Sequence, residues 1–510
     1  MAAALIGVFL FPLHAEEDPA VVQVEGGRIR GAVGNGLVVF KGIPFARPPV
    51  GSLRWRPPQP VASWEGIRET TAFSPNPIQP KDGGPTAANT SEDCLYANVW
   101  RPAEANGPLP VMVWIYGGGL VTGGASLYPG DALAKQGILV VSFNYRLGRL
   151  GFFTHPALAR EAPEDLRGNY GYMDQLAALQ WVQRNIAAFG GDPKNVTLSG
   201  ESAGGGSVLV HLTSPLSRGL FQRAILESPG IPAPRAAATP MRSLAAAESI
   251  AMEYARVAGI QGDDAAVLKG LRDLSVDELG KGAEHYVLAI QDGPEIPGLS
   301  HSIVDGRLVV EPPETSLREG RQQMIPVLCG GNDYDLSITP AATKDALFSQ
   351  FGVLSPQARE LYDPEGAVAL PDLRQAVMAD LVMLEPPRYL AQAMTRAGQP
   401  AYLYRFSYVP QALRSTMRGA THASEILFAW DCVGAALNGK ATAEDEAMAK
   451  TTSGYWVSFV KTGDPNGGGR PNWPRHDPAS PDVMNFTLSG PSFAPDPLKA
   501  RLDLCEKIRK

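Results

Sequence analysis

The stretch from Val196 to Leu212, VTLSGESAGGGSVLVHL, constrains the fold of this chain more than any other segment. Its apolar, β-prone lead-in runs into small and then apolar residues after Ser202, which predicts a strand that turns sharply into a helix. A residue on so tight a corner has strained dihedrals, and side chains on either side of it would collide. Gly200 and Gly204 relieve that crowding. The GxSxG spacing therefore predicts that Ser202 projects its hydroxyl from the corner as a nucleophile.

The segments around this corner are predicted to alternate between strands and helices. Residues 109–119, LPVMVWIYGGG, and 137–148, GILVVSFNYRLG, are continuous apolar runs, as expected for strands buried on both faces. Residues 173–189 have helical periodicity, and Gly-Gly-Asp-Pro after them is a stop signal. Together these patterns predict an α/β fold with a large, mostly parallel central sheet flanked by helices.

The remaining segments extend this plan. Residues 21–46 read as short strands separated by glycine turns, which predicts an antiparallel edge. Residues 324–333, MIPVLCGGND, and 400–409, PAYLYRFSYV, predict two more strands of the same sheet. Between them and the serine corner, residues 229–299 are rich in proline turns and alanine-rich helical segments. We expect a helical cap inserted over one domain that spans residues 16–510.

Composition excludes several classes of function. The chain has 510 residues, 44% hydrophobic and 19% charged, which is typical of a globular protein. Its net charge of −7 provides no basic surface for a phosphate backbone, so nucleic acid is not an expected partner. Apart from the N-terminus, no run of 18 uninterrupted apolar residues occurs, so no membrane span is expected in the mature chain. The expected partner is a small-molecule or oligomeric substrate, and the sequence does not define the oligomeric state.

The first 15 residues, MAAALIGVFLFPLHA, resemble the apolar core of a signal peptide that ends in a small residue. The segment lacks the basic residues that usually precede such a core, so a simple apolar extension is the alternative. We predict a signal peptide over residues 1–15 and a secreted or periplasmic protein.

The four cysteines are too few and too scattered for a disulfide scaffold or a CxxC metal site; they are Cys94, Cys329, Cys432 and Cys505. Buried thiols are the favoured interpretation for most of them, with a disulfide as the alternative if the chain is exported. No cysteine–histidine cluster suggests a metal, and no motif suggests a cofactor.

A serine hydroxyl needs a base to take its proton and a carboxylate to orient that base. Of the seven histidines, His422 has the most distinctive setting, a glycine-containing loop before an apolar helical segment late in the chain. For the carboxylate, Asp333 and Asp335 both follow the predicted strand that ends in Gly330, and chemistry alone does not choose between them. The glycine run at residues 117–119 follows another buried strand, so its backbone amides could hold an oxyanion.

In family order, several blocks of this sequence resemble those of the type-B carboxylesterases, which include bacterial nitrobenzyl esterases and cholinesterases: FKGIPFARPPVGSLRW, SEDCLYANVW, SFNYRLGRLGF, the long block ending in VTLSGESAGG, and GATHASEI. The resemblance implies an α/β-hydrolase fold and the hydrolysis of carboxylic esters through an acyl-enzyme. It implies Ser202 as nucleophile, His422 as base and Asp335 as acid, although most members have Glu at that place and Asp333 remains the second choice.

The same resemblance implies an oxyanion hole made by the N–H groups of Gly118, Gly119 and Ala203, and an auxiliary acidic role for Glu201. It also implies that Cys94 has lost its usual disulfide partner. Residues 75–91 contain no aromatic residue, which disfavours choline esters. Leu120 follows the glycine run at a place where the family more usually has an aromatic residue, which implies a wider pocket on that side, and we expect hydrophobic or bulky esters as substrates. An amide or lactone hydrolase with the same residues, or an esterase-like binding module, are the alternatives.

Overall fold

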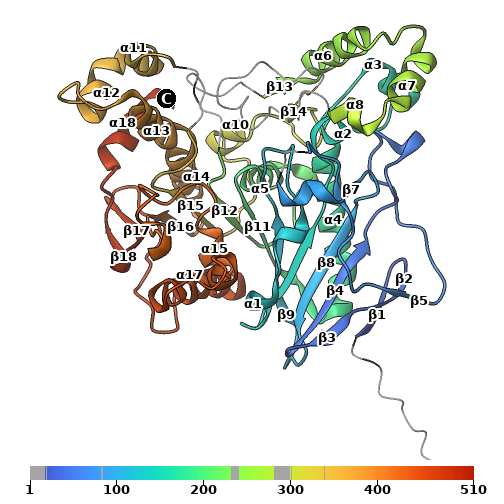
Figure 1. The fold of residues 1–510 in the computed structure, drawn as a ribbon, viewed down its shortest axis with the longest axis horizontal. Coiled ribbons are helices and arrows are strands. Elements are labelled where there is room, and N and C mark those ends of the chain that lie inside the picture. Colours follow the sequence, from blue (N-terminus) through green and yellow to red (C-terminus); the bar gives the residue numbers. More distant parts are fainter. Residues whose placement is uncertain are drawn as a thin grey trace, which may run out of the picture.

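The computed structural model describes residues 18, 20–81, 84–230, 241–280, 299, 301–337, 339 and 341–509. Its centre is a sheet of 11 strands (Figure 1) in the order β18-β17-β16-β15-β12-β11-β9-β10-β8-β4-β3. Along this order the strands are β18 (Gly490–Pro495), β17 (Asp482–Thr487), β16 (Ala401–Phe406), β15 (Val327–Asn332), β12 (Arg223–Glu227), β11 (Gly191–Glu201), β9 (Leu109–Ile115), β10 (Leu139–Phe143), β8 (Tyr96–Pro102), β4 (Leu37–Pro44) and β3 (Ala32–Gly34).

All neighbouring pairs from β17 through β10 in this order are parallel. At the two ends, β18 and the β8-β4-β3 meander pair antiparallel. The prediction of a mostly parallel α/β sheet is thus confirmed, and so are the antiparallel edge and the two later strands. A smaller sheet holds the first strands, β1 (Val21–Val24) and β2 (Gly27–Arg30), with β5 (Ile67–Glu69).

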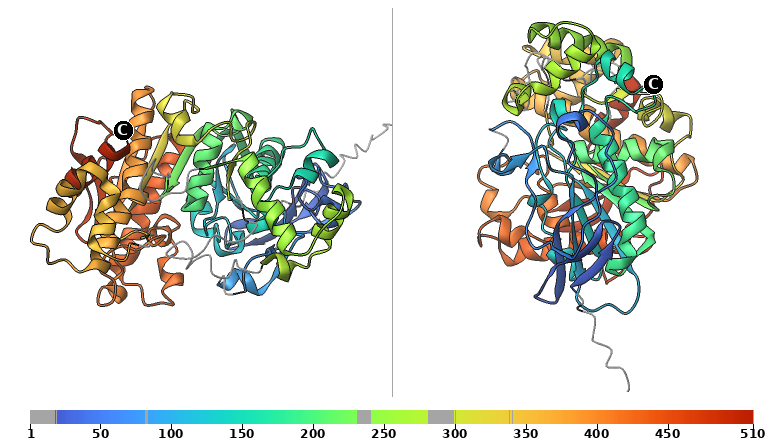
Figure 2. Two further views of the ribbon diagram at one scale, coloured as in Figure 1. Left: turned by 90° about the horizontal axis from the view of Figure 1, so that it is seen from above. Right: turned by 90° about the vertical axis from the view of Figure 1, so that its right-hand side faces the viewer.

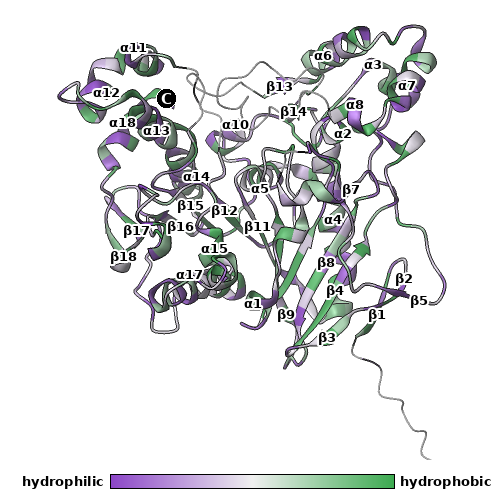
Figure 3. Cartoon of the chain, in the orientation of Figure 1, coloured by the Kyte–Doolittle hydropathy of each residue, from purple (hydrophilic) through white to green (hydrophobic). Residues whose placement is uncertain are grey.

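The central strands form because their residues are apolar on both faces. All five residues of β10 are buried, and Figure 3 shows the central strands as largely hydrophobic while the peripheral helices carry hydrophilic positions. Helices cover such a sheet on both sides; they include α4 (Tyr170–Asn185), α5 (Ala203–Thr213), α14 (Glu385–Arg396) and α17 (Ala443–Thr462).

One boundary differs from the sequence prediction. The helix that begins at Tyr170 continues as a 3₁₀ turn to Phe189, and Gly190 ends it with a left-handed φ of 80°. Strand β11 then starts directly at Gly191, within the segment expected to form only a turn. Gly191 already pairs with Leu109 of β9, and the register shifts before Val196. The turn residues therefore lie in an irregularity of the strand.

Helices α6 (Leu244–Val257), α7 (Asp264–Asp273) and α8 (Val276–Gly280) lie within the range predicted as a cap, 229–299. Seen from above, these yellow-green helices lie at one end of the molecule and the orange C-terminal helices at the other (Figure 2, left). Residues 231–240 and 281–298 of the predicted cap lie outside the described residues, as does the predicted signal peptide, 1–15.

All four cysteines are described and each is a free thiol, with Cys94, Cys329 and Cys505 buried. The disulfide alternative is therefore not realised in this structure. In the part of the chain that the structure describes, no helix has the length and apolar character needed to cross a membrane.

Candidate active site

Ser202 lies between β11 and α5 with φ 57° and ψ −126°, a strained backbone for a residue with a side chain. Its N–H donates to the carbonyl of Glu227 at 2.9 Å, which holds the corner against the neighbouring strand. A Cβ added to Gly200 would lie 2.6 Å from the carbonyl carbon of Gly204, and one added to Gly204 would lie 2.1 Å from the carbonyl oxygen of Ile115. Only glycine fits at both places, which explains the GxSxG spacing.

The imidazole of His422 lies between Ser202 and Asp335. Its Nε2 is 2.8 Å from Ser202 Oγ, and its Nδ1 is 2.5 Å from Asp335 Oδ1. The three residues come from the corner after β11, the segment after β15 and a loop late in the chain. The carboxyl ends of adjacent parallel strands meet at one edge of the sheet, where α/β folds bind their ligands.

Asp335 is 1% exposed and accepts further hydrogen bonds. Ser228 Oγ donates to its Oδ2 at 2.6 Å, as does the Asn332 N–H at 3.0 Å, and the Leu336 N–H donates to Oδ1 at 2.7 Å. Burial would raise the pKa of Asp335, but His422 and these donors outweigh it and hold the pKa below its usual value. The carboxylate is therefore charged and fixed in orientation.

Asp333, the second candidate acid, has a different environment. Its Oδ1 accepts the N–H of Ala420 at 2.8 Å, and a Cβ added to Gly419 would lie 2.8 Å from the same oxygen. The side chain thus supports the loop that leads to His422. Of the two aspartates, the structure brings Asp335 to the imidazole.

The glycine run after β9 passes beside the serine. A Cβ added to Gly117 would lie 3.0 Å from Ser202 Cβ. Gly118 and Gly119 have φ values of 93° and 64°, and their N–H groups find no acceptor among the described residues. Ala203 is the first residue of α5, where N–H groups have no partner inside the helix. All three predicted oxyanion residues therefore lie on segments that adjoin Ser202.

Glu201 is one of three buried glutamates at the same edge of the sheet. Its Oε1 lies 3.2 Å from His422 Nε2. Glu227, its partner in the parallel register of β12, accepts from Trp456 Nε1 at 3.1 Å, and Glu425 accepts from the amide of Asn332. Burial raises the pKa of Glu201, Glu227 and Glu425 to about 8. The raised pKa favours the neutral form of these side chains, and mutual repulsion among the three carboxyl groups acts in the same direction.

Sequence reasoning identified Glu201 but missed Glu227 and Glu425. The signal was present, because each is an acidic residue directly at one end of an apolar run, in RAILES and SEILFAW. A carboxyl group is rarely fully buried without a specific partner, so its place in such a run is informative.

The match to known proteins decides the family. The sequence fits the profile described as "Carboxylesterase family" over residues 18–351 and 354–501. The chain belongs to this family. It is a carboxylic ester hydrolase with the α/β-hydrolase fold.

Similar carboxylesterases extend over almost the whole chain. Fumonisin B1 esterase of Sphingopyxis macrogoltabida is 37% identical over 97% of this chain and 92% of its own length. Liver carboxylesterase 1 of Oryctolagus cuniculus is 36% identical over 90% of this chain and 88% of its own length. A solved PNB esterase structure has a TM-score of 0.80 and 33% identity, and covers 96% of this chain and 100% of its own.

The described residues of this carboxylesterase include no group of three or more His, Cys, Asp or Glu side chains that could hold a metal ion.

Proposed function

We propose that this carboxylesterase cleaves its esters through a covalent acyl-enzyme on Ser202. The observation that carries the proposal is the continuous line of contacts from the Ser202 hydroxyl through both nitrogens of His422 to Asp335, at 2.8 and 2.5 Å. Both distances are within hydrogen-bond reach, as a nucleophile, its base and the residue that orients the base require.

In the first half of the reaction, His422 Nε2 takes the Ser202 proton as Oγ attacks the ester carbonyl carbon. The C–O bond to the alcohol then breaks, and the imidazolium gives its proton to the leaving alcohol. In the second half, water attacks the acyl-enzyme, His422 takes the proton of the water, and Ser202 leaves with that proton. Asp335 holds the Nδ1–H tautomer and stabilises the imidazolium that forms twice per cycle.

The negative charge on the carbonyl oxygen needs donors that are already in place. We assign this role to the N–H groups of Gly118, Gly119 and Ala203. Two observations support the assignment: the N–H groups of Gly118 and Gly119 find no acceptor among the described residues, and a Cβ added to the adjacent Gly117 would lie 3.0 Å from Ser202 Cβ. The loss of one such donor typically lowers kcat by about 10²–10³.

For the substrate, we propose a hydrophobic or bulky ester. Two features support this: Leu120, which follows the glycine run, is aliphatic, and a similar protein carries the name fumonisin B1 esterase. Simple p-nitrophenyl esters of increasing acyl length would measure the size of the acyl site, and an amide with the same acyl group would measure the preference for esters over amides.

The test of the mechanism is hydrolysis of p-nitrophenyl acetate, butyrate and octanoate by the wild type and by Ser202→Ala. Ser207→Ala is a matched control, since that hydroxyl bonds to the carbonyl of Ala203 one turn away. We expect Ser202→Ala to lose at least about 10³-fold in kcat/KM and to lose labelling by a fluorophosphonate, while Ser207→Ala keeps both. An active, labelled Ser202→Ala enzyme would refute the mechanism, and a wild type inert on all the esters and the amide would favour a binding module.

We further propose that the chain is exported and cleaved after Ala15. Mass spectrometry of the enzyme recovered outside the cytoplasm of the producing cell would find Glu16 as its first residue, whereas an intact N-terminus would contradict the proposal.

A further inference from the structure

Helix α2 (Gly148–Gly151) lies between the glycine run of the active site and the α6–α8 helices. On one side, the N–H of Gly148 donates to the carbonyl of Leu120 at 2.8 Å. Leu120 directly follows Gly118 and Gly119, so this hydrogen bond fixes the end of the segment that carries the proposed oxyanion amides.

Leu120 needs such a restraint because its φ is 63°. A left-handed backbone costs a residue with a side chain roughly 1–2 kcal/mol. That conformation persists only where the surrounding structure imposes it. The Leu120 side chain is buried, and the N–H groups of Val121 and Thr122 donate to the Gly118 carbonyl at 3.1 and 2.9 Å. The hydrogen bond from Gly148 to the Leu120 carbonyl is the one of these restraints that comes from outside the turn, so the position of α2 influences how well the strained turn is kept.

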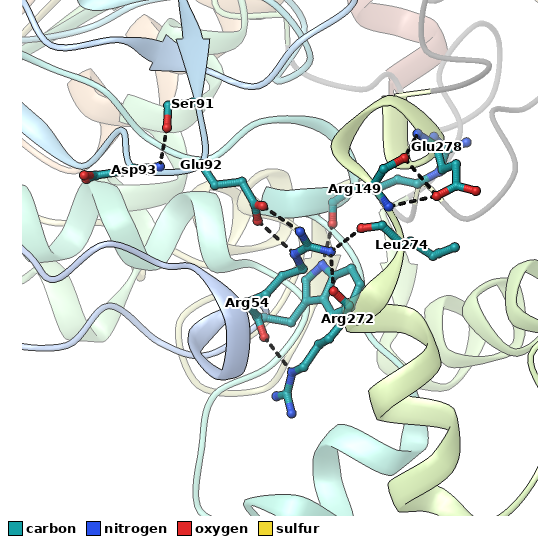
Figure 4. A network of polar contacts seen from close by, with 10 residues as sticks. Arg54, Ser91, Glu92, Asp93, Arg149, Arg272, Leu274 and Glu278 are labelled. Atoms are coloured by element: carbon teal, nitrogen blue, oxygen red, sulfur yellow. Dashed lines mark hydrogen bonds and ion pairs between the residues drawn. The ribbon is translucent and has the colours of Figure 1, made fainter.

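On the other side of α2, Arg149 reaches to the helices of the predicted cap. The side chain is 4% exposed, and its Nη1 donates to the carbonyl of Leu279 in α8. Its guanidinium lies 4.9 Å from the ring centre of Tyr254 in α6, and its own carbonyl accepts from Trp55 Nε1 at 2.8 Å. Figure 4 shows Arg149 extending toward this helical region.

We propose that Arg149 is a positioning residue that couples α8 to the oxyanion amides through α2 and Leu120. The proposal rests on the proposed function and adds a residue that does not touch the reacting atoms. When Arg149 is anchored on Leu279, α2 is fixed, the Gly148–Leu120 hydrogen bond keeps Leu120 left-handed, and the Gly118 and Gly119 amides stay in place. Without the anchor, Leu120 relaxes and these amides turn away from the carbonyl oxygen.

A second arginine provides a matched control. Arg54 pairs with Glu92 at 2.6 Å and donates to the carbonyls of Arg272 and Leu274, at the end of α7, at 3.0 and 2.8 Å (Figure 4). It therefore docks the same helical region by the same chemistry, but it lies outside the segment that runs from α2 to Leu120.

The experiment compares an ester with its thionoester, in which the carbonyl oxygen is replaced by sulfur, for the wild type, Arg149→Met, Arg149→Lys and Arg54→Met. The oxyanion amides stabilise the oxygen anion better than the larger sulfur anion, so the ratio of the two kcat/KM values reports on their placement. Thermal unfolding of each variant measures stability separately, and fluorophosphonate labelling of Ser202 tests the underlying mechanism independently.

We expect Arg149→Met to lower kcat for the ester by roughly 10-fold with little change in KM, and to lower the ester-to-thionoester ratio by a similar factor. Complete removal of one oxyanion donor typically lowers kcat by about 10²–10³, and a donor that is only displaced should cause part of that loss. Arg149→Lys keeps a donor and a cation, so it restores part of the ratio. Arg54→Met lowers the melting temperature without changing the ratio. An unchanged ratio in Arg149→Met, or an equal change in Arg54→Met, would overturn the proposal.

Discussion

Replacing Asp335 by Asn tests the hydrogen bonds that the Asp335 carboxylate accepts in the active site. The carboxylate accepts four hydrogen bonds, from His422 Nδ1, Ser228 Oγ and the N–H groups of Asn332 and Leu336. An amide has a single acceptor oxygen, so its NH₂ group must face either the Asn332 N–H or the Leu336 N–H. Each orientation leaves buried donors opposed, which destabilises the fold by about 1–3 kcal/mol.

The effect on rate is larger than the effect on stability. When the NH₂ group faces His422, it favours the tautomer with the proton on Nε2, which cannot accept the Ser202 proton. In either orientation, the charge that stabilises the imidazolium is lost. A loss of this kind lowers kcat by roughly 10⁴-fold, or about 5.5 kcal/mol of transition-state stabilisation.

The assay is kcat/KM for p-nitrophenyl butyrate, with the melting temperature measured on the same preparations. Asp333→Asn is the control, because its amide oxygen can still accept the Ala420 N–H, and we expect its activity to stay within about threefold of wild type. A folded Asp335→Asn enzyme within 10-fold of wild type, or a collapse of activity in Asp333→Asn alone, would refute the assignment of the acid.

Two further predictions concern stability. Burial raises the pKa of Glu227 from 4.5 to about 8, so the contribution of its neutral form to stability is complete below about pH 4.5 and is lost as the pH rises through about 8. Glu227→Gln should therefore reduce the fall in melting temperature between pH 5 and pH 9 by roughly 2–4 °C or more. An identical fall in the wild type and the variant would contradict this prediction. A Cβ at Gly204 would lie 2.1 Å from the carbonyl oxygen of Ile115, whereas one at Gly206 would lie 3.2 Å from that of Pro229; Gly204→Ala should lower the unfolding free energy by about 3 kcal/mol and Gly206→Ala by less than 1, and equal denaturant midpoints would disprove this reading.

The sheet and the serine corner could be predicted because their causes are local. Apolar runs on both faces specify buried parallel strands, and the crowding around Ser202 specifies glycines at fixed distances from it. The predicted start of strand β11 was wrong, because residues that by themselves favour a turn are included in the strand. Pairing of Gly191 with Leu109, far away in the sequence, extends β11 to that point.

The choice of acid shows the limit of local reasoning. Asp333 and Asp335 follow the same strand with the same chemistry, and only the arrival of two distant segments separates them. Asp333 accepts a hydrogen bond from the backbone of Ala420, whereas Asp335 is hydrogen-bonded to Ser228 and His422. Family resemblance favoured Asp335, which is the aspartate that contacts His422 in the structure, whereas the residues alone did not choose between the two.

The four free cysteines have a practical consequence. No covalent cross-link between distant segments contributes to this fold, so the chain has no need of an oxidant or a disulfide isomerase to reach its native state. A reductant such as dithiothreitol removes nothing from the folded enzyme. The fold is therefore expected to be the same in reducing and in non-reducing buffer.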